Sequence, residues 1–179
     1  MNLQEITIVD EDDNELRAAK KLETHRQGLL HRAFSVFVFD KDGNWLLQRR
    51  AEHKYHSGGL WSNTCCGHPG IAQDCLDEAR KRLWFEMGID CELAHAFVLR
   101  YKAAFENGLI ENEIDHVFIG QHNGPCEPNP DEVSEAFWIS SDELRARLAD
   151  RPDSFTAWFK LCFREFDCDQ KVRAESMTA

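Results

Sequence analysis

Runs of apolar residues along the chain predict most of its strands. Residues 32–39, "RAFSVFVF", are rich in β-branched and aromatic side chains, and the turn-forming Asp40-Lys41-Asp42-Gly43 follows them. Residues 45–48 therefore predict the return strand of a hairpin. A loop is expected over residues 51–63, which hold two adjacent glycines. Further strand-like runs occupy residues 6–9, 96–101, 109–120 and 136–139.

Other segments repeat their apolar residues at helical spacing. Residues 71–87 place an apolar stripe on one face, and Gly88 is typical of the position just after a helix. A short helix is expected over residues 142–149. Aromatic residues recur at helical spacing from residue 155 to residue 166, which predicts a long amphipathic helix that closes the fold. Strands interleaved with helices predict an α/β or α+β sandwich.

The 179 residues suffice for one domain with a hydrophobic core. Residues 1–170 are expected to form this single domain, and residues 171–179 a polar C-terminal tail. No apolar run approaches the roughly 20 residues that span a bilayer, and the first residues lack the pattern of a secretory signal. We expect a cytoplasmic protein that does not enter a membrane.

The cysteine spacing and the net charge indicate the state of the thiols and the class of binding partner. Seven cysteines without paired CxxC spacing favour reduced thiols over a disulfide framework. The net charge of −11 argues against a nucleic-acid partner, because a phosphate backbone requires a basic surface. A small anionic molecule still fits, provided that basic residues gather locally.

Three histidines and two glutamates are candidate metal ligands. Glu111 and Glu113 stand two apart in a strand-like run, so both side chains should lie on one face. Adjacent carboxylates repel each other unless a cation or a shared proton neutralises them. With His25, His31 and His68 they would suit manganese, iron or zinc. From spacing alone, a solvated sheet face with scattered histidines explains these residues equally well.

The segment from Gly67 to Ile89 has the frame of the Nudix box, G-x5-E-x7-R-E-U-x-E-E-x-G-U, in which U is a bulky aliphatic residue. The ends of the frame fit, together with Leu83, Glu86 and Gly88. Its other positions hold Gln73, Lys81, Arg82 and Phe85. Nudix hydrolases use the acids of this box to hold several Mg²⁺ ions. Glu86 alone could hold one Mg²⁺, so the scaffold is retained while the hydrolytic acids are lost.

Several basic residues lie close in sequence to these candidates. Each one alone is most simply a surface residue. Together they suggest a clamp for a diphosphate, in which arginine makes paired contacts and lysine supplies a point charge. The set is Lys20, Lys21, Arg49, Arg50, Lys54 and Arg82.

Three stretches together carry a resemblance to a known family. "LLHRAFSVFVF", "LLQRRAEHKYHSGGLWSNTCCGHPG" and "ENEIDHVF" resemble type I isopentenyl diphosphate isomerases, the Nudix-fold form of that enzyme. The resemblance runs from about Lys20 through Trp158. It implies a Nudix-like mixed β-sheet flanked by helices. It also implies interconversion of isopentenyl and dimethylallyl diphosphate, by protonation at one carbon and deprotonation at another, in isoprenoid biosynthesis.

The resemblance also implies roles for individual residues. Cys66 and Glu113 match the proton-transfer residues, and Tyr101 matches a tyrosine that assists beside the glutamate. The order in which Cys66 and Glu113 act stays open. The implied ligands of a Mn²⁺, Zn²⁺ or Mg²⁺ ion are His25, His31, His68, Glu111 and Glu113, and Glu86 matches a ligand of Mg²⁺ on the diphosphate. The implied phosphate contacts are Lys21, Arg50, Lys54 and Arg82, with Lys20 as an alternative to Lys21.

Two aromatic residues are candidates for the hydrocarbon end of the substrate. An aromatic face stabilises a carbocation through its quadrupole, and Trp158 or Trp61 could supply one. The resemblance favours Trp158. Its position on the apolar stripe of a helix also fits plain core packing.

The sequence contains two adjacent cysteines, and their positions alone do not show which one faces a site. Adjacent side chains of an extended segment point to opposite faces, so only one of Cys65 and Cys66 can address a site. The resemblance selects Cys66 and leaves Cys65 as a packing thiol. Two rival functions are a Nudix hydrolase of a nucleoside diphosphate derivative and a zinc module built from Cys65, Cys66 and His68. Either a monomer or a homodimer is compatible with the sequence.

Overall fold

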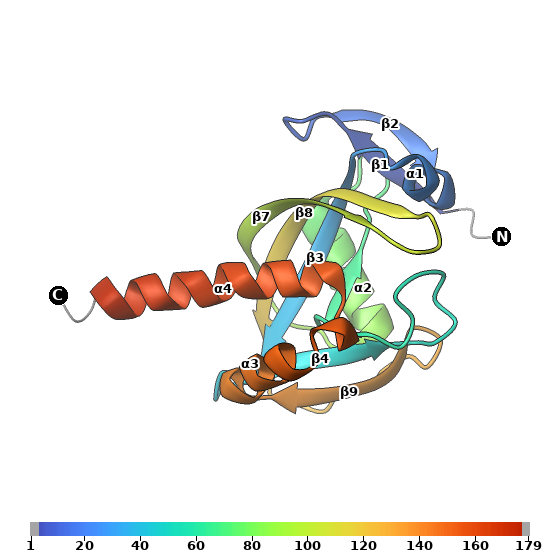
Figure 1. Cartoon of the computed structure of the whole chain (residues 1–179). Helices are drawn as coiled ribbons and strands as arrows, with labels where there is room; N and C mark the ends of the chain where they lie inside the picture. The colour runs from blue at the N-terminus through green and yellow to red at the C-terminus, as the bar shows by residue number, and fades with distance from the viewer. Residues whose placement is uncertain (1–3, 177–179) are drawn as a thin grey trace.

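The central strand of the fold is β3 (His31–Phe39). The computed structural model describes residues 4–176, with side chains through residue 167. Strand β8 (Ile110–Gln121) runs parallel to β3 along its whole length, from His31 opposite Glu113 to Phe39 opposite Gln121. On the other side of β3 lies the short antiparallel strand β6 (Cys65–Gly67). This arrangement places the ENE segment and the paired cysteines on strands that share one neighbour (Figure 1).

Antiparallel strands extend this sheet on both sides. β7 (Leu93–Ala104) pairs with β8 along almost its full length. β1 (Glu5–Val9) and β2 (Glu15–Lys20) form a hairpin, which joins β3 at Ile8 opposite His31. The sheet is therefore mixed, as expected.

The predicted hairpin of β3 and β4 (Trp45–Arg50) pairs at a single position, Phe39 opposite Trp45. The turn forms as expected, since Asp40 accepts hydrogen bonds from the Asn44 side chain and backbone. Beyond the turn, β4 pairs instead with β9 (Val133–Ile139) and β5 (Trp61–Ser62). The two strands diverge because β6 occupies the edge of β3 that a return strand would take.

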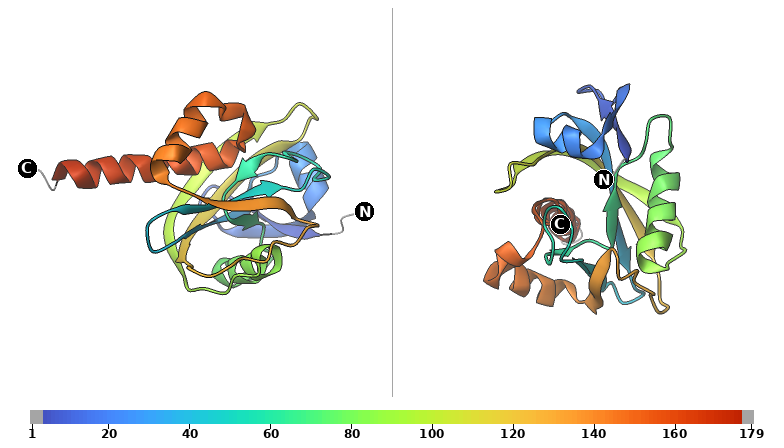
Figure 2. Two further views of the ribbon diagram at one scale, coloured as in Figure 1. Left: turned by 90° about the horizontal axis from the view of Figure 1, so that it is seen from below. Right: turned by 90° about the vertical axis from the view of Figure 1, so that its right-hand side faces the viewer.

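Helices cover both faces of the sheet (Figure 2). On one face, α2 (Cys75–Met87) buries its apolar stripe against Phe34, Val36 and Leu46. The opposite face is covered by α3 (Ser141–Asp150) and α4 (Ala157–Ser176), with the short 3-10 helix η1 (Pro152–Ser154) between them. The second core contains Phe37, Trp45, Val117, Leu144 and Phe159. The predicted sandwich of a mixed sheet between helices is confirmed.

The observed helix ends differ from the predictions for local reasons. α2 begins at Cys75 rather than residue 71, because the Asp74 side chain caps it by accepting from the Asp77 N–H at 2.9 Å. Gly88 ends α2 as predicted, with φ of 66° and a hydrogen bond to the Trp84 carbonyl. α4 continues through Ser176, so it includes the start of the predicted tail, and residues 177–179 lie outside the described residues. The domain boundary at residue 170 stays a prediction.

Five elements were not predicted, namely α1 (Lys21–Gln27), β2, β5, β6 and η1. α1 forms in a segment for which no helix was predicted, and it ends at Gly28 with φ of 61°. β2 is an edge strand that exposes most of its side chains, so it lacks the apolar pattern of a strand. β5 lies within the predicted loop over residues 51–63.

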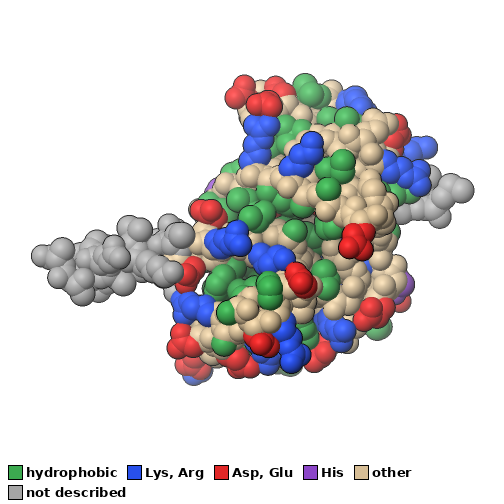
Figure 3. Space-filling view, in the orientation of Figure 1, with side chains coloured by type: hydrophobic (Ala, Val, Ile, Leu, Met, Phe, Trp, Pro, Cys, Tyr) green, Lys and Arg blue, Asp and Glu red, His purple; other side chains and the backbone are tan. Residues whose placement is uncertain are grey.

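Two features of the described residues bear on membranes and on charge. Between residues 4 and 176, no helix is long and apolar enough to cross a membrane. On the face seen in Figure 3, Lys and Arg side chains lie among Asp and Glu side chains. This face therefore offers no continuous basic surface.

Candidate active site

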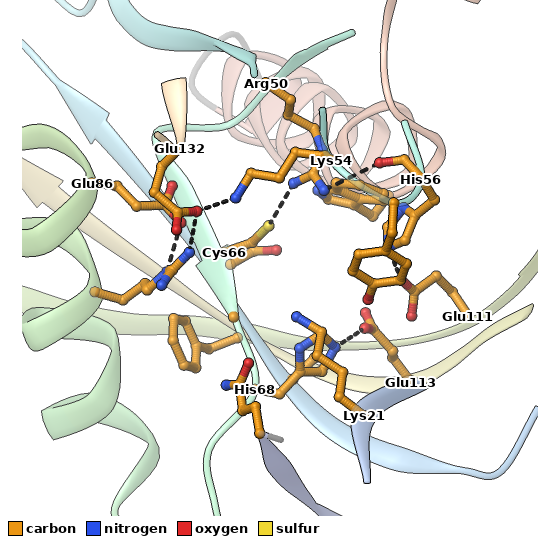
Figure 4. A pocket seen from close by; sticks show the side chains of 18 of the residues that line it. Lys21, Arg50, Lys54, His56, Cys66, His68, Glu86, Glu111, Glu113 and Glu132 are labelled. Carbon is orange, nitrogen blue, oxygen red and sulfur yellow. Dashed lines mark hydrogen bonds and ion pairs between the residues drawn. The ribbon is translucent and has the colours of Figure 1, made fainter. Parts of the chain in front are cut away.

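A cavity of about 300 Å³ is lined by residues of β3, α2 and α4, together with other segments. It brings together most of the residues predicted from the sequence (Figure 4). The predicted residues that line it are Lys21, Arg50, Lys54, Cys66, His68, Arg82, Glu86, Tyr101, Glu111, Glu113 and Trp158. His25 and His31 lie behind this lining and are fully buried.

The five candidate metal ligands form one cluster, which we call the metal group: His25, His31, His68, Glu111 and Glu113. One ligand atom from each residue lies within 4.8 Å of the others. His25 Nε2 is 3.0 Å from Glu111 Oε2, and His68 Nε2 is 2.8 Å from Glu113 Oε1. The two carboxylates share one face of β8, as the spacing predicted, so the alternative of scattered histidines and a solvated sheet face is wrong.

Two histidines of the metal group, His25 and His31, are held by backbone carbonyls in the orientation that a metal requires. His25 Nδ1 lies 2.6 Å from the Lys21 carbonyl, and His31 Nδ1 lies 2.8 Å from the Leu29 carbonyl. A carbonyl only accepts hydrogen bonds, so each Nδ1 carries a proton, and Nε2 is the ring nitrogen that remains to bind a cation in the cluster. His31 Nε2 and Glu111 Oε2 are buried and make no hydrogen bond within the described part of the chain. A divalent cation would satisfy both atoms, so these residues fit a metal ion.

Burial and mutual charge shift the pKa values within the metal group. Burial and the neighbouring Glu111 raise the pKa of Glu113 to about 7. Burial acts to lower the pKa of His31, but the adjacent carboxylates of Glu111 and Glu113, 3.5 and 3.4 Å from its Nε2, raise it to about 9. Burial acts to raise the pKa of Glu111, yet contacts with His25, His31 and His56 hold it well below its usual range. The metal-free cluster thus retains protons that a divalent cation would displace.

The carboxylate of Glu113 faces two partners at once. Its Oε1 lies toward His68 and His31, whereas its Oε2 accepts a hydrogen bond of 2.5 Å from the Tyr101 hydroxyl. Tyr101 is buried, and burial together with the charge of Glu113 raises its pKa well above the usual value. The hydroxyl therefore stays protonated and can donate. The structure brings the predicted Tyr101–Glu113 pair together.

The two adjacent cysteines of β6 point in opposite directions. Cys65 is fully buried and packs with Phe34 and Val36, whereas Cys66 lines the cavity. Arg50 Nη1 lies 3.9 Å from the Cys66 sulfur. Burial raises the pKa of Cys66 to about 12 despite this arginine, so the thiol holds its proton at neutral pH. The zinc-module hypothesis is wrong, because Cys65 and Cys66 cannot reach one ion together.

A second cluster, which we call the Arg82 cluster, consists of Lys54, Arg82, Glu86 and Glu132. Arg82 donates to Glu86 Oε1 at 2.6 Å and to Glu132 Oε2 at 2.5 Å. Lys54 also donates to Glu132, and Gln48 donates to the second oxygen of Glu86 at 2.9 Å. Glu132 was not predicted, since it lies outside the motifs, just before β9. These contacts leave the two predicted phosphate contacts paired with carboxylates.

Two further basic residues line the cavity. Lys21 begins α1, and burial lowers its pKa. Lys20 is exposed on β2 and is not part of the cavity lining, so Lys21 is the residue that the structure places at the cavity. Arg50 lies over the Trp158 ring, with its guanidinium carbon 5.2 Å from the ring centroid. Positive charge therefore gathers inside the cavity of a protein whose net charge is −11.

The two candidate tryptophans differ in position. Trp158 is buried, donates from Nε1 to Asn63 Oδ1 at 3.0 Å and lines the cavity, so it serves both packing and the site. Trp61 is not among the residues that line the cavity. It packs edge-on against Phe137 with ring centroids 4.6 Å apart, because β5 directs this side chain toward β9. The prediction that Trp61 faces the substrate is therefore not supported.

His56 is a site residue that the sequence analysis missed. Its Nε2 lies 3.1 Å from Glu111 Oε1, and its side chain lines the cavity. The predicted loop over residues 51–63 holds two histidines, His53 and His56, and nothing in their spacing distinguishes them. Only the folded loop shows which one reaches the cluster.

Comparison with known proteins identifies the fold class. Residues 29–159 match the NUDIX domain. A structure of DR0079 from Deinococcus radiodurans superposes with a TM-score of 0.68 at 15% identity, covering 82% of this chain and 90% of that one. A MutT protein from Methanosarcina mazei Go1 superposes with a TM-score of 0.64 at 20% identity, covering 79% and 96%. The fold is that of a Nudix protein, as the degenerate box predicted.

Proteins related in sequence identify the family within the Nudix proteins. The chain is 49% identical over 158 residues to Isopentenyl-diphosphate Delta-isomerase 2 of Aromatoleum aromaticum, covering 88% of this chain and 84% of the relative. It is 47% identical to Isopentenyl-diphosphate Delta-isomerase of Pectobacterium atrosepticum, covering 91% of each. The chain therefore belongs to the isopentenyl-diphosphate Delta-isomerase family, and the resemblance stated from its sequence is confirmed.

Proposed function

We propose that the protein interconverts isopentenyl diphosphate and dimethylallyl diphosphate, a step of isoprenoid biosynthesis. The observation that carries this proposal is one cavity lined by two groups suited to proton transfer, Cys66 and Glu113. Basic residues line the same cavity, and a metal group adjoins it. Family membership supports the same reaction.

The reaction moves a double bond by two proton transfers. A proton is added to the terminal alkene carbon, which creates positive charge at the tertiary carbon. A second proton then leaves the CH₂ group on the other side of that carbon, and the double bond forms there. Two transfer groups from different strands suit this sequence, one being Cys66 on β6 and the other Glu113 on β8. The order in which they act stays open.

Tyr101 and the metal group control the proton on Glu113. The metal group would hold one divalent ion, for which Mn²⁺, Zn²⁺ and Mg²⁺ are candidates. Such an ion supplies positive charge that lowers the proton affinity of the carboxylate. Tyr101 donates to the oxygen of Glu113 on the side away from His68, so it can relay a proton between that oxygen and the cavity.

The two ends of the cavity suit the two ends of the substrate. Lys21, Arg50, Lys54 and Arg82 offer donors for a diphosphate. Glu86 would hold a Mg²⁺ ion, which would supply positive charge for the same phosphates. Trp158 offers an aromatic face to the positive charge that develops on the hydrocarbon, and its burial excludes water that would capture a carbocation.

A Nudix hydrolase is the alternative, and the α2 side of the cavity argues against it. Hydrolysis in that class uses several acids of the box to hold metal ions. Here Arg82 and Phe85 line the cavity at two of those positions, and Glu86 is the buried acid between them and the core. An arginine and a phenylalanine do not bind Mg²⁺.

One experiment tests the proposal directly. Isopentenyl diphosphate is incubated with the protein and Mg²⁺ in D₂O, and deuterium is followed by NMR. The expected result is deuterium in the methyl group of dimethylallyl diphosphate, with no release of phosphate or diphosphate. Phosphate release from a nucleoside diphosphate derivative, without deuterium in either isoprenoid, would establish the hydrolase instead. Cytoplasmic location and a monomeric or homodimeric state stay predictions.

A further inference from the structure

His56 contacts the metal group from outside it. Its Nε2 lies 3.1 Å from Oε1 of Glu111, while Oε2 of Glu111 faces His25 and His31 at 3.0 and 3.5 Å. His56 is not one of the residues whose ligand atoms lie within 4.8 Å of one another. It therefore contacts the distal oxygen of a ligand rather than the position of the ion.

The neighbours of His56 require its proton on Nε2, whereas those of His25 and His31 require a proton on Nδ1. A carboxylate oxygen accepts, so His56 must carry its proton on Nε2 to contact Glu111. Its Nδ1 then accepts from the Ser57 hydroxyl, 3.3 Å away. In His25 and His31 the proton lies on Nδ1 instead, held by backbone carbonyls. His25 and His31 thus direct Nε2 into the metal group, whereas His56 directs its Nε2 at the outer oxygen of Glu111.

The segment that carries His56 is held in one conformation. The 51–60 loop is closed at its base by a hydrogen bond from the Arg50 N–H to the Leu60 carbonyl, 3.0 Å long. Ser57 has a positive φ of 52°. A Cβ at Gly58 would lie 2.4 Å from the Glu52 carbonyl oxygen, so this turn requires glycine. The ring of His56 stacks on Phe105, with centroids 4.9 Å apart and planes at 15°.

We propose that His56 is a positioning residue of the metal group, which holds Oε1 of Glu111 so that Oε2 is directed at the cation. The proposal rests on the metal centre of the proposed function. Groups that orient a metal ligand through its second atom commonly change metal affinity by about 10- to 100-fold. The same loop carries Lys54, and the His56 carbonyl accepts from Arg50 at 3.4 Å (Figure 4). One loop therefore contacts both the metal group and the residues proposed for the diphosphate.

The test is the dissociation constant for Mn²⁺, measured by competition between the protein and a chromogenic chelator. His56→Phe preserves the ring that stacks on Phe105 but has no donor. His56→Gln loses the ring but retains an N–H that can reach Glu111. We expect His56→Phe to raise the dissociation constant by about 10-fold or more, and His56→Gln by about 3-fold at most.

A purely structural role for His56 predicts the opposite order, since Phe preserves the packing and Gln does not. Equal affinities for both variants and the native protein would also overturn the proposal. Ser57→Ala is a milder change that leaves the ring in place and removes the donor to Nδ1. We expect it to raise the dissociation constant by about 3-fold. If His56→Phe does not fold, unchanged binding in Ser57→Ala overturns the proposal.

A double-mutant cycle shows whether His56 acts through Glu111. In a Glu111→Gln background, His56→Phe should cause no further loss of Mn²⁺ affinity. Full additivity would mean that His56 acts elsewhere. A native protein that binds no Mn²⁺ overturns both this proposal and the metal centre. Native binding with unchanged binding in His56→Phe overturns this proposal alone.

Discussion

The metal group and the Arg82 cluster lie at the same cavity, but they are prepared for their partners in different ways. The metal group is buried, and backbone carbonyls hold His25 and His31 through Nδ1. Among the described residues, His31 Nε2 and Glu111 Oε2 are without hydrogen bonds. The Arg82 cluster lies nearer to solvent, with the Arg82 side chain 32% exposed. Its cations are already paired with Glu86 and Glu132.

The difference implies that a divalent cation and a diphosphate displace different partners when they bind. A divalent cation entering the metal group gains partners that are already in place and displaces protons. A diphosphate reaching the Arg82 cluster must instead share Arg82 and Lys54 with Glu132. We therefore expect the metal group to determine whether the site can react, and the Arg82 cluster to tune how tightly the substrate binds.

The largest effect is expected on turnover, in variants that distinguish loss of proton transfer from loss of metal binding. Cys66→Ala and Glu113→Gln each remove one proton-transfer group, so each should lower kcat by about 10³-fold. Glu113 also belongs to the metal group, so only Glu113→Gln should weaken Mn²⁺ binding. The measurements are kcat with isopentenyl diphosphate and Mn²⁺ content after dialysis. Loss of Mn²⁺ in Cys66→Ala, or near-normal turnover in either variant, would contradict these assignments.

The second effect is the pH dependence of metal binding. In the metal-free protein the pKa values of His31 and Glu113 are raised to about 9 and about 7, so both retain protons near neutral pH. Mn²⁺ must displace these protons, so its affinity should fall as pH falls below about 9, and more steeply below about 7. From pH 8 to pH 6 we expect a loss of about 1,000-fold, of which about 100-fold comes from His31 and about 10-fold from Glu113, at up to tenfold per pH unit for each displaced proton.

Calorimetry in two buffers of different ionisation enthalpy counts the protons released. At pH 7 the number should exceed one, since His31 is fully and Glu113 half protonated. Metal affinity that does not change with pH, or binding without proton release, would contradict the raised pKa values. It would also weaken the contrast with the Arg82 cluster.

Sequence patterns could predict the elements whose residues obey a period. The strands at residues 32–39 and 109–120 and the apolar stripe of α2 were found because burial on one face imposes that period. The metal group followed from two carboxylates at strand spacing and from the family resemblance. α1 and β2 were missed because they are short, and β2 exposes most of its side chains to solvent.

Contacts between loops could not be predicted in this way. His56 and Glu132 reach the cavity only because the 51–60 loop and the segment before β9 meet it in three dimensions. Trp61 shows the reverse error, since an aromatic residue beside the motif points to β9 rather than to the cavity. A strand as short as β5 shows no alternation in the sequence, so the direction of its side chains could not be predicted.

The third effect concerns the Arg82 cluster. Glu132→Gln removes one negative charge beside Arg82 and Lys54 while preserving an oxygen that can accept from them. An arriving anion then meets less repulsion, so inorganic diphosphate should inhibit about 5-fold more strongly, at roughly 1 kcal/mol for one charge pair. The measurement is the competitive inhibition constant of diphosphate. The matched control is Glu135→Gln, an exposed position on β9, which should have no effect.

Weaker inhibition in Glu132→Gln would mean that the charge of Glu132 orients the cations more than it competes with the anion. The Arg82 cluster would then resemble the metal group in being prepared for its ligand. Neither outcome affects Mn²⁺ binding, which provides an internal check.

A smaller effect is expected at the hydrocarbon end of the cavity. Trp158→Phe retains an aromatic face but weakens its attraction for positive charge and removes the hydrogen bond to Asn63. We expect kcat to fall by about 3- to 10-fold. The free energy of unfolding should fall by about 1 kcal/mol. Denaturation by urea and steady-state kinetics measure the two changes, and an unchanged kcat would assign Trp158 to packing alone.

The smallest effect on turnover is expected at Cys65, next to the residue with the largest. Cys65→Ala removes a sulfur that packs with Phe34 and Val36 on the face of β6 away from the cavity. The free energy of unfolding should fall by about 1 kcal/mol, whereas kcat and Mn²⁺ affinity should stay within about 2-fold of the native values. Urea denaturation and kinetics on the purified variant provide the test. A large loss of turnover would mean that β6 presents Cys65 to the substrate, and Cys66 would then be the packing thiol.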